Sequence, residues 1–192
     1  MKKGINLFYK EVFGYLKDSA NYVYLSIFLF FAAGIFGFVF PELFSSYFNE
    51  IIRNLIDKTT GLNAAELIFF IFGNNVTGSF VGIFSGIFVG LIPIINIIIN
   101  GLLVGYVLAL AIPIAGFSTI LRLVPHGIFE LPAIFISIGL GIKMGLFFLT
   151  KKNKFKELKR RMLLSFKVFI GVVVPLLIVA AIIEGLLIAF FP

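Results

Sequence analysis

The feature that most constrains this chain is an almost unbroken apolar stretch that runs from residue 67 to residue 150. A helix needs about 20 apolar residues to cross the hydrocarbon core of a bilayer, so the stretch is long enough for three crossings. Over the whole chain 60% of the residues are hydrophobic and 13% are charged, whereas soluble domains carry about 25% charged residues. The composition excludes a soluble globule and predicts an all-α, polytopic transmembrane bundle that forms one domain, 1–192.

Five membrane spans are expected, near residues 22–40, 67–91, 97–112, 131–149 and 164–191. Pro41 ends the first span. Because proline disfavours helix interiors, we place the breaks in the long apolar stretch at Pro93, at Pro113 and at Pro125-His126-Gly127. The sequence leaves open whether residues 67–75 form a re-entrant segment or extend the second span.

Three further segments place apolar residues at helical spacing with polar residues opposite, near 3–17, 44–57 and 153–163. Helices of this kind lie along the membrane surface, and we expect them to be interfacial. A role as docking surfaces for partner proteins is the alternative. It applies best to the segment near 44–57, because that segment carries charges of both signs.

The basic residues gather beside the apolar spans, within residues 2–17 and 151–167. Lys and Arg near membrane spans favour the cytoplasmic side, so both clusters are expected there, with four crossings between them. The prediction is a multi-pass protein of the cell membrane with a cytoplasmic N-terminus and an outer C-terminus. The net charge of +7 therefore reflects topology, and we expect no nucleic-acid partner.

Glycines recur at intervals of four along the predicted spans. The positions are Gly78, Gly82, Gly86 and Gly90, followed by Gly101 with Gly105 and Gly141 with Gly145. Glycine lets helix backbones approach closely in a membrane, so we expect helix packing within the chain. A subunit interface and a pore lining are the alternatives, and the ridges lead us to expect a homodimer.

A few polar side chains interrupt the apolar spans, where such groups are costly and often functional. In the predicted topology six of them fall on the outer side: Asn74, Asn75, Arg122, His126, Glu130 and Glu184. Glu130 follows His126 by four residues and precedes Pro132, an arrangement that suits the first turn of a helix. Asn100 and Lys143 lie near the inner ends of their spans and are expected to stand apart.

The sequence allows three roles for this outer cluster. It can be a hydrogen-bonded network of structural value, a route for protons or ions, or a metal site at His126 and Glu130. The metal site has one histidine and lacks the HExxH order. The chain has no Cys, no GxSxG motif and no P-loop, so no catalytic residue and no cofactor are predicted.

Asn74-Asn75, a glycine-rich span, Asn100-Gly101 and the segment 125–133 follow one another in an order that resembles the stage II sporulation protein M family. The resemblance runs from the first span to the last, and His-Gly-x-x-Glu-x-Pro-Ala is its most distinctive part. It implies these characteristic positions: Asn75, Asn100, Gly101, His126, Gly127, Glu130 and Pro132. In spore formers, such proteins are membrane anchors or scaffolds in an engulfment complex with cell-wall hydrolases. Members also occur in organisms that make no spores.

We therefore expect a non-enzymatic membrane scaffold whose partners are the lipid bilayer and other membrane or cell-envelope proteins. The alternative is a small transporter or channel component that uses an outer polar site at His126 and Glu130. A metal-dependent membrane hydrolase is a weaker alternative. The scaffold predicts a closed, self-satisfied polar cluster with no cavity reaching both sides, whereas the transporter predicts a cluster that lines a path.

Overall fold

The computed structural model describes the backbone of residues 2–116, 118–151 and 153–190, and the side chains of residues 4–116, 127–151, 153–184 and 187. Every regular element within these backbone ranges is helical. Five helical segments are long and apolar enough to cross a membrane. The predicted all-α class and the five spans are thus confirmed.

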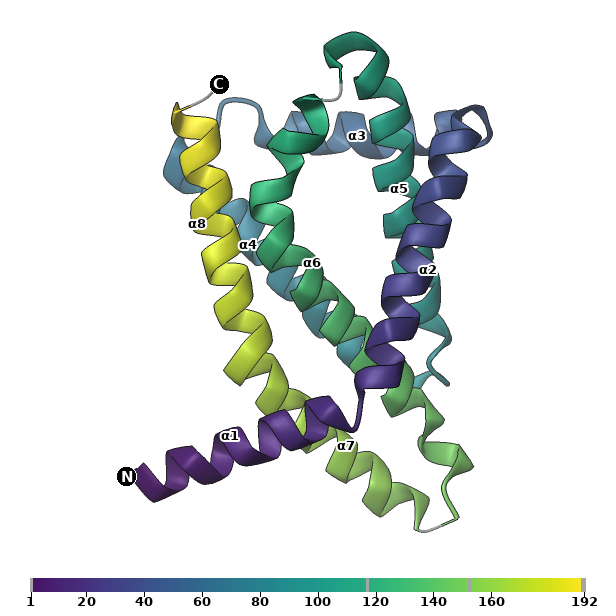
Figure 1. The fold of residues 1–192 in the computed structure, drawn as a ribbon, viewed down its shortest axis with the longest axis vertical. Helices are drawn as coiled ribbons and strands as arrows, with labels where there is room; N and C mark the ends of the chain where they lie inside the picture. Colours follow the sequence, from purple (N-terminus) through teal and green to yellow (C-terminus); the bar gives the residue numbers. More distant parts are fainter. Residues whose placement is uncertain (1, 117, 152, 191–192) are drawn as a thin grey trace.

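The chain crosses the bundle back and forth (Figure 1). α1 (Lys2–Lys17) leads into α2 (Ala20–Val39), and the 3-10 turn η1 (Pro41–Phe44) leads into α3 (Ser45–Thr59). The next elements are α4 (Ala64–Phe84), η2 (Ser85–Ile87), α5 (Leu91–Ala115) and α6 (Ser118–Gly145). They are followed by η3 (Leu146–Leu149), α7 (Lys154–Val168), the π-turn η4 (Phe169–Val173) and α8 (Val174–Phe190). The basic helices α1 and α7 share one end of the bundle, and α3 lies at the other end.

The helix break predicted at Pro125-His126-Gly127 is wrong. α6 continues through Pro125-His126-Gly127, which places Glu130 near the middle of a helix and not in a first turn. In a bilayer, neighbouring helices can satisfy the backbone groups that a proline frees, so proline ends helices less reliably there than in water. The other two breaks lie close to real helix ends, because α5 begins two residues before Pro93 and ends two residues after Pro113. Pro93 lies in the first turn of α5, where a missing N–H is tolerated.

The second span begins earlier than expected, because α4 starts at Ala64. The Asn63 side chain accepts hydrogen bonds from the backbone N–H groups of Ala65 and Glu66, and the Glu66 carboxylate accepts one from Asn63 N–H. This capping box supplies partners for the first N–H groups of the helix. Residues 67–75 therefore extend the second span, and no re-entrant segment forms.

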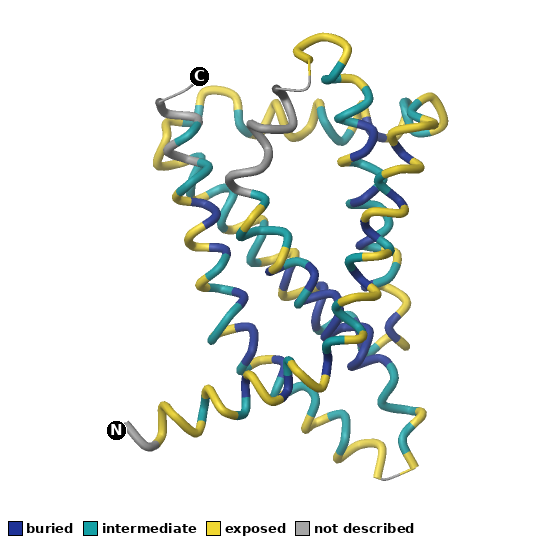
Figure 2. The backbone as a smooth tube through the Cα atoms, viewed as in Figure 1, coloured by how far each residue is buried: buried dark blue, intermediate teal, exposed yellow. Residues whose placement is uncertain are grey.

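Among the spanning segments with described side chains, Gly127–Leu149, which contains most of α6, is the most buried (Figure 2). α6 contacts α2, α4, α5 and α8. The most extensive contact between two helices joins α2 to α5. There a Cβ added to Gly105 would stand 2.8 Å from the carbonyl carbon of Gly34 and from the backbone nitrogen of Phe38. The two backbones touch at this point, as glycine permits.

α3 is held across the end of α5 by one aromatic contact. The Phe48 side chain is 1% exposed, and its ring centre lies 5.5 Å from that of Tyr106 on α5. The Tyr106 hydroxyl donates a hydrogen bond of 2.8 Å to Asn49 Oδ1. This pair attaches α3 to α5 through Phe48 and Asn49, while Tyr47, Leu55 and Ile56 of its apolar stripe stay exposed, as does its polar stripe.

Candidate functional site

A polar cavity of about 370 Å³ lies between α4, α5 and α6. Its polar lining consists of Asn74, Asn75, Thr77 and Ser79 from α4, Asn96 and Asn100 from α5, and Glu130 and Ser137 from α6. Polar groups inside a membrane bundle are costly unless they serve structure or function. A cavity with so many of them is the candidate functional site of this protein.

The cavity lies at mid-depth in the bundle. Asn75 is eleven residues into α4, which is about 16 Å from the start of the helix at 1.5 Å per residue. Asn100 and Glu130 likewise lie well inside α5 and α6. The predicted position of Asn74 and Asn75 at the outer end of the second span is wrong, because the helix begins at Ala64.

Asn100 was expected to stand apart from Asn75 and Glu130, and this expectation is also wrong. The three residues come from three different helices and line the same cavity. Asn75 and Glu130 lie beside this cavity on α4 and α6, two helices that pack against each other. The implied family positions Asn75, Asn100 and Glu130 thus meet in space, although the chain separates them widely.

The polar lining is only partly satisfied by the protein. Asn100 Nδ2 donates to Asn96 O at 2.9 Å and to Asn96 Oδ1 at 3.0 Å. Ser137 Oγ donates to Ala133 O at 2.8 Å. The Ser79 side chain is 4% exposed, and among the described residues its hydroxyl has no hydrogen-bond partner. The prediction that the outer polar cluster is closed and self-satisfied stays a prediction, because these bonds belong to other lining residues.

Four polar lining residues were missed in the sequence, although helical spacing points to each of them. Thr77 follows Asn74 by three residues, and Ser79 follows Asn75 by four. Asn96 precedes Asn100 by four residues, and Ser137 follows Glu130 by seven. Residues at these intervals share one helix face. Polar residues at such spacings around each motif residue are the signal that would have found them.

The structure shows less about the positions of the other members of the predicted polar cluster. Glu184 on α8 is near enough to Glu130 to act on it electrostatically. Arg122 and His126 belong to α6, but their side chains lie outside the described residues. The hypothesis of a metal site at His126 and Glu130 therefore stays a hypothesis. Of the remaining motif positions, Gly127 and Pro132 lie on α6.

The predicted packing glycines have different surroundings. Positions at which an added Cβ would meet backbone or side-chain atoms at 3.2 Å or less are Gly82, Gly86, Gly90, Gly101, Gly105, Gly141 and Gly145. Gly78 lines the cavity instead, and an added Cβ would meet nothing within 4 Å. Gly90 lies outside the helices, with φ of 72° in the left-handed region.

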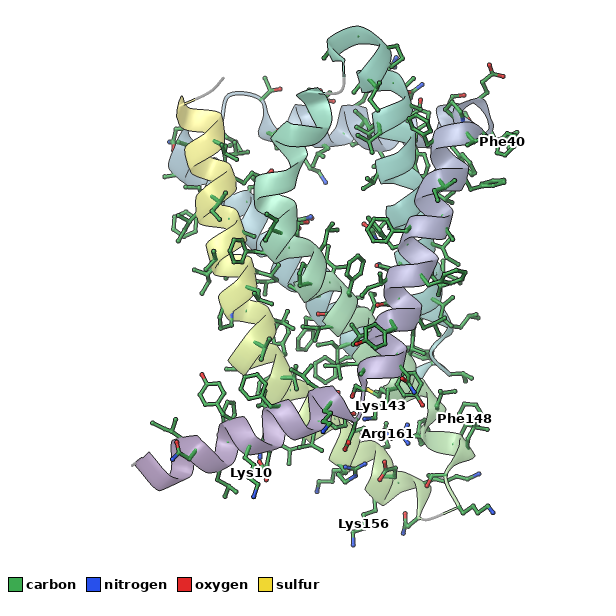
Figure 3. The ribbon with its side chains drawn as sticks, viewed as in Figure 1. Lys10, Phe40, Lys143, Phe148, Lys156 and Arg161 are labelled. Atoms are coloured by element: carbon green, nitrogen blue, oxygen red, sulfur yellow. The ribbon has the colours of Figure 1, made fainter. Side chains whose placement is uncertain are left out.

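A second polar cluster lies where α1, α6 and α7 meet (Figure 3). Lys143 is 8% exposed, and its Nζ donates to Ser19 Oγ at 2.9 Å and to Asp18 O at 3.0 Å. Nζ also lies 4.1 Å from the ring centre of Tyr15, and burial raises the pKa of the Tyr15 hydroxyl. Arg161 on α7 donates to the Lys143 carbonyl. This cluster joins three helices, so its evident role is structural.

The fold and the cavity define a polytopic α-helical membrane protein with a polar site inside its bundle. A model of the family described as Stage II sporulation protein M matches residues 26–187. The chain belongs to the stage II sporulation protein M family, which confirms the resemblance found in the sequence. No curated protein and no solved structure matches the chain.

Proposed function

We propose that this protein is a membrane scaffold that holds partner membrane or cell-envelope proteins against the bilayer through the exposed face of α3. The observation that carries the proposal is the polar stripe of α3, formed by Glu50, Arg53, Asn54 and Asp57 at helical spacing. All four residues are exposed, and none of the three charged ones forms an ion pair with another described residue.

The way α3 is held supports this role. Phe48 and the hydrogen bond from Tyr106 to Asn49 attach the helix to α5 and leave the stripe exposed. A surface ordered in advance loses less entropy when it binds a partner. Charges of both signs give register and selectivity at an interface. The scaffold role implied by the family resemblance agrees with these properties.

Charge reversal on α3 tests the proposal. A photo-crosslinking residue at Asn54 is introduced into the full-length protein in its native membrane, with and without Arg53→Glu and Asp57→Lys. We expect a defined protein crosslink that the double reversal abolishes. The matched control Lys154→Glu, an exposed site on α7 at the other end, should leave the crosslink intact. An identical crosslink in the reversed variant would remove the docking role from α3.

A second candidate function, as a small transporter component, is favoured by the polar residues that line the cavity between α4, α5 and α6. Flux of protons, alkali cations or small polar solutes into proteoliposomes tests it. The expected result is a flux that Glu130→Gln abolishes and Glu42→Gln, an exposed glutamate on η1, preserves. A flux that Glu130→Gln leaves unchanged would exclude this site as the path.

We also propose a cytoplasmic N-terminus, an outer C-terminus and a homodimer. Because the chain has no native Cys, single cysteines at Lys10 and Arg53 can be labelled from one side of intact cells. An impermeant reagent should reach position 53 and not position 10, and the reverse pattern would invert the topology. A detergent-corrected mass equal to one chain would refute the dimer.

A further inference from the structure

The end of the bundle formed by α1 and α7 carries an excess of positive charge. Exposed lysines there that form no ion pair with another described residue are Lys10, Lys17, Lys151, Lys154, Lys156 and Lys159. α1, its connection to α2, and α7 contain three acidic residues. Glu11 and Glu157 already form ion pairs with other cations, and Asp18 is the third. The positive charge of these lysines is therefore largely unbalanced by the protein.

The lysines come from opposite ends of the sequence and meet only in the tertiary structure. α1 packs against α7, and Lys167 Nζ on α7 donates a hydrogen bond of 2.5 Å to Glu11 Oε2 on α1. Figure 3 shows Lys10 and Lys156 pointing away from the bundle at this end. The exposed lysines of the two helices thus form one surface, which we call the α1–α7 basic surface.

Exposed apolar side chains lie beside these lysines. On α1, Ile5, Tyr9 and Phe13 follow one another at intervals of four and are between 42% and 60% exposed. The rings of Tyr9 and Phe13 stack with their centres 6.0 Å apart. On α7, Phe155 is exposed and precedes Lys159 by four residues, so the two share one helix face. Both helices therefore expose positive charge and large apolar side chains together.

The charges at the opposite end of the bundle have a different balance. On η1, α3 and the first turn of α4, the exposed charged residues are four acids and two bases: Glu42, Glu50, Asp57 and Glu66 with Arg53 and Lys58. Basic helices with exposed apolar side chains bind anionic bilayer surfaces, because the apolar groups enter the acyl region while the cations attract phosphates. A negatively charged lipid would therefore be attracted to the α1–α7 end and not to the α3 end.

We propose that the α1–α7 basic surface binds the headgroups of anionic phospholipids in the adjacent leaflet and enriches these lipids around the protein. The apolar side chains of both helices lie among the acyl chains, and the lysines attract the phosphates. Each lysine close to an anionic surface strengthens association about five-fold. A soluble polyanion offers nothing to the exposed apolar side chains, whereas a bilayer offers both phosphates and acyl chains. The inference is separate from the scaffold role, which uses α3.

The test measures lipid selectivity by electron spin resonance. The full-length protein is reconstituted in phosphatidylcholine with a trace of spin-labelled phosphatidylglycerol or of spin-labelled phosphatidylcholine, with the label at the same chain position. The motionally restricted fraction of each lipid gives the ratio of their association constants. At low salt we expect phosphatidylglycerol to associate at least about two-fold more strongly. In about 1 M NaCl, which screens charges beyond about 3 Å, the ratio should fall close to one.

Exchange of lysine for glutamine shows which helices carry the selectivity. Lys10→Gln with Lys17→Gln removes two exposed charges from α1, and Lys156→Gln with Lys159→Gln removes two from α7. Each pair should lower the selectivity ratio, and the four substitutions together should bring it close to one. If the fourfold variant fails to fold, the two pairs and the salt dependence still decide.

The matched control is Arg53→Gln with Lys58→Gln, which removes two exposed cations from α3 and should leave the ratio unchanged. Equal association of the two lipids, a ratio that persists at high salt, or a ratio that the lysine substitutions leave unaltered would overturn the proposal. Loss of selectivity from one pair alone would restrict the site to one helix and overturn the combined surface. Binding of an oligonucleotide without any lipid preference would assign the surface to a soluble polyanion instead.

Discussion

Replacement of Gly105 by alanine tests how α2 and α5 pack. The added Cβ would stand 2.8 Å from the carbonyl carbon of Gly34 and from the nitrogen of Phe38, below the 3.0 Å that real Cβ atoms keep. It would lie closer still to the Gly34 carbonyl oxygen. All three are backbone atoms, so no change of rotamer can relieve the overlap, and the two helices must separate.

The expected cost follows from this geometry. Overpacking in a close-packed interior costs about 1–3 kcal/mol, and contact with rigid backbone belongs in the upper part of that range. The helix propensity of alanine returns up to about 1 kcal/mol relative to glycine. We therefore expect Gly105→Ala to lower the free energy of unfolding by about 1–2 kcal/mol.

Reversible unfolding by dodecyl sulfate in mixed micelles, followed by circular dichroism, measures this difference. Gly78→Ala is the matched control, because Gly78 belongs to the same four-residue spacing pattern but has nothing within 4 Å of an added Cβ. It should be neutral or slightly stabilising. Equal stabilities for Gly105→Ala and Gly78→Ala would refute the inferred backbone contact.

Three further predictions concern hydrogen bonds, and the same unfolding assay measures their energies. Ser19→Ala leaves the buried Lys143 ammonium one partner short, so we expect a loss of about 1–3 kcal/mol that falls below about 1 kcal/mol in a Lys143→Met background. Equal losses in the two backgrounds would contradict the pairing. Tyr106→Phe should cost about 1 kcal/mol and accelerate tryptic cleavage within α3; unchanged cleavage would mean that the bond to Asn49 does not hold the helix. Asn63→Ala should cost about 1 kcal/mol and speed hydrogen exchange at the Ala65 and Glu66 amides. Unaltered exchange there would argue against the capping box.

Much of the fold is predictable from periodicity and hydropathy. The apolar stretches indicate the five spans, and the amphipathic pattern near 44–57 predicts the helix observed as α3. These features are local, because crossing a bilayer requires length and apolar composition and an interfacial helix requires one apolar face. The break at Pro125 was the exception, since the neighbours of α6 decide whether its backbone tolerates this proline.

The membrane location, the helical class and the motif positions thus follow from the order of residues along the chain. The convergence of Asn75, Asn100 and Glu130 on one cavity does not, because periodicity tells which residues share a helix face and not which helix lies opposite. Likewise Gly78 and Gly86 have the same spacing, yet one lines the cavity and the other packs on the backbone of Gly141. In a bilayer the hydrophobic effect does not drive helices together, so shape complementarity between whole helix surfaces chooses the neighbours. That choice places the polar cavity at the middle of the bundle.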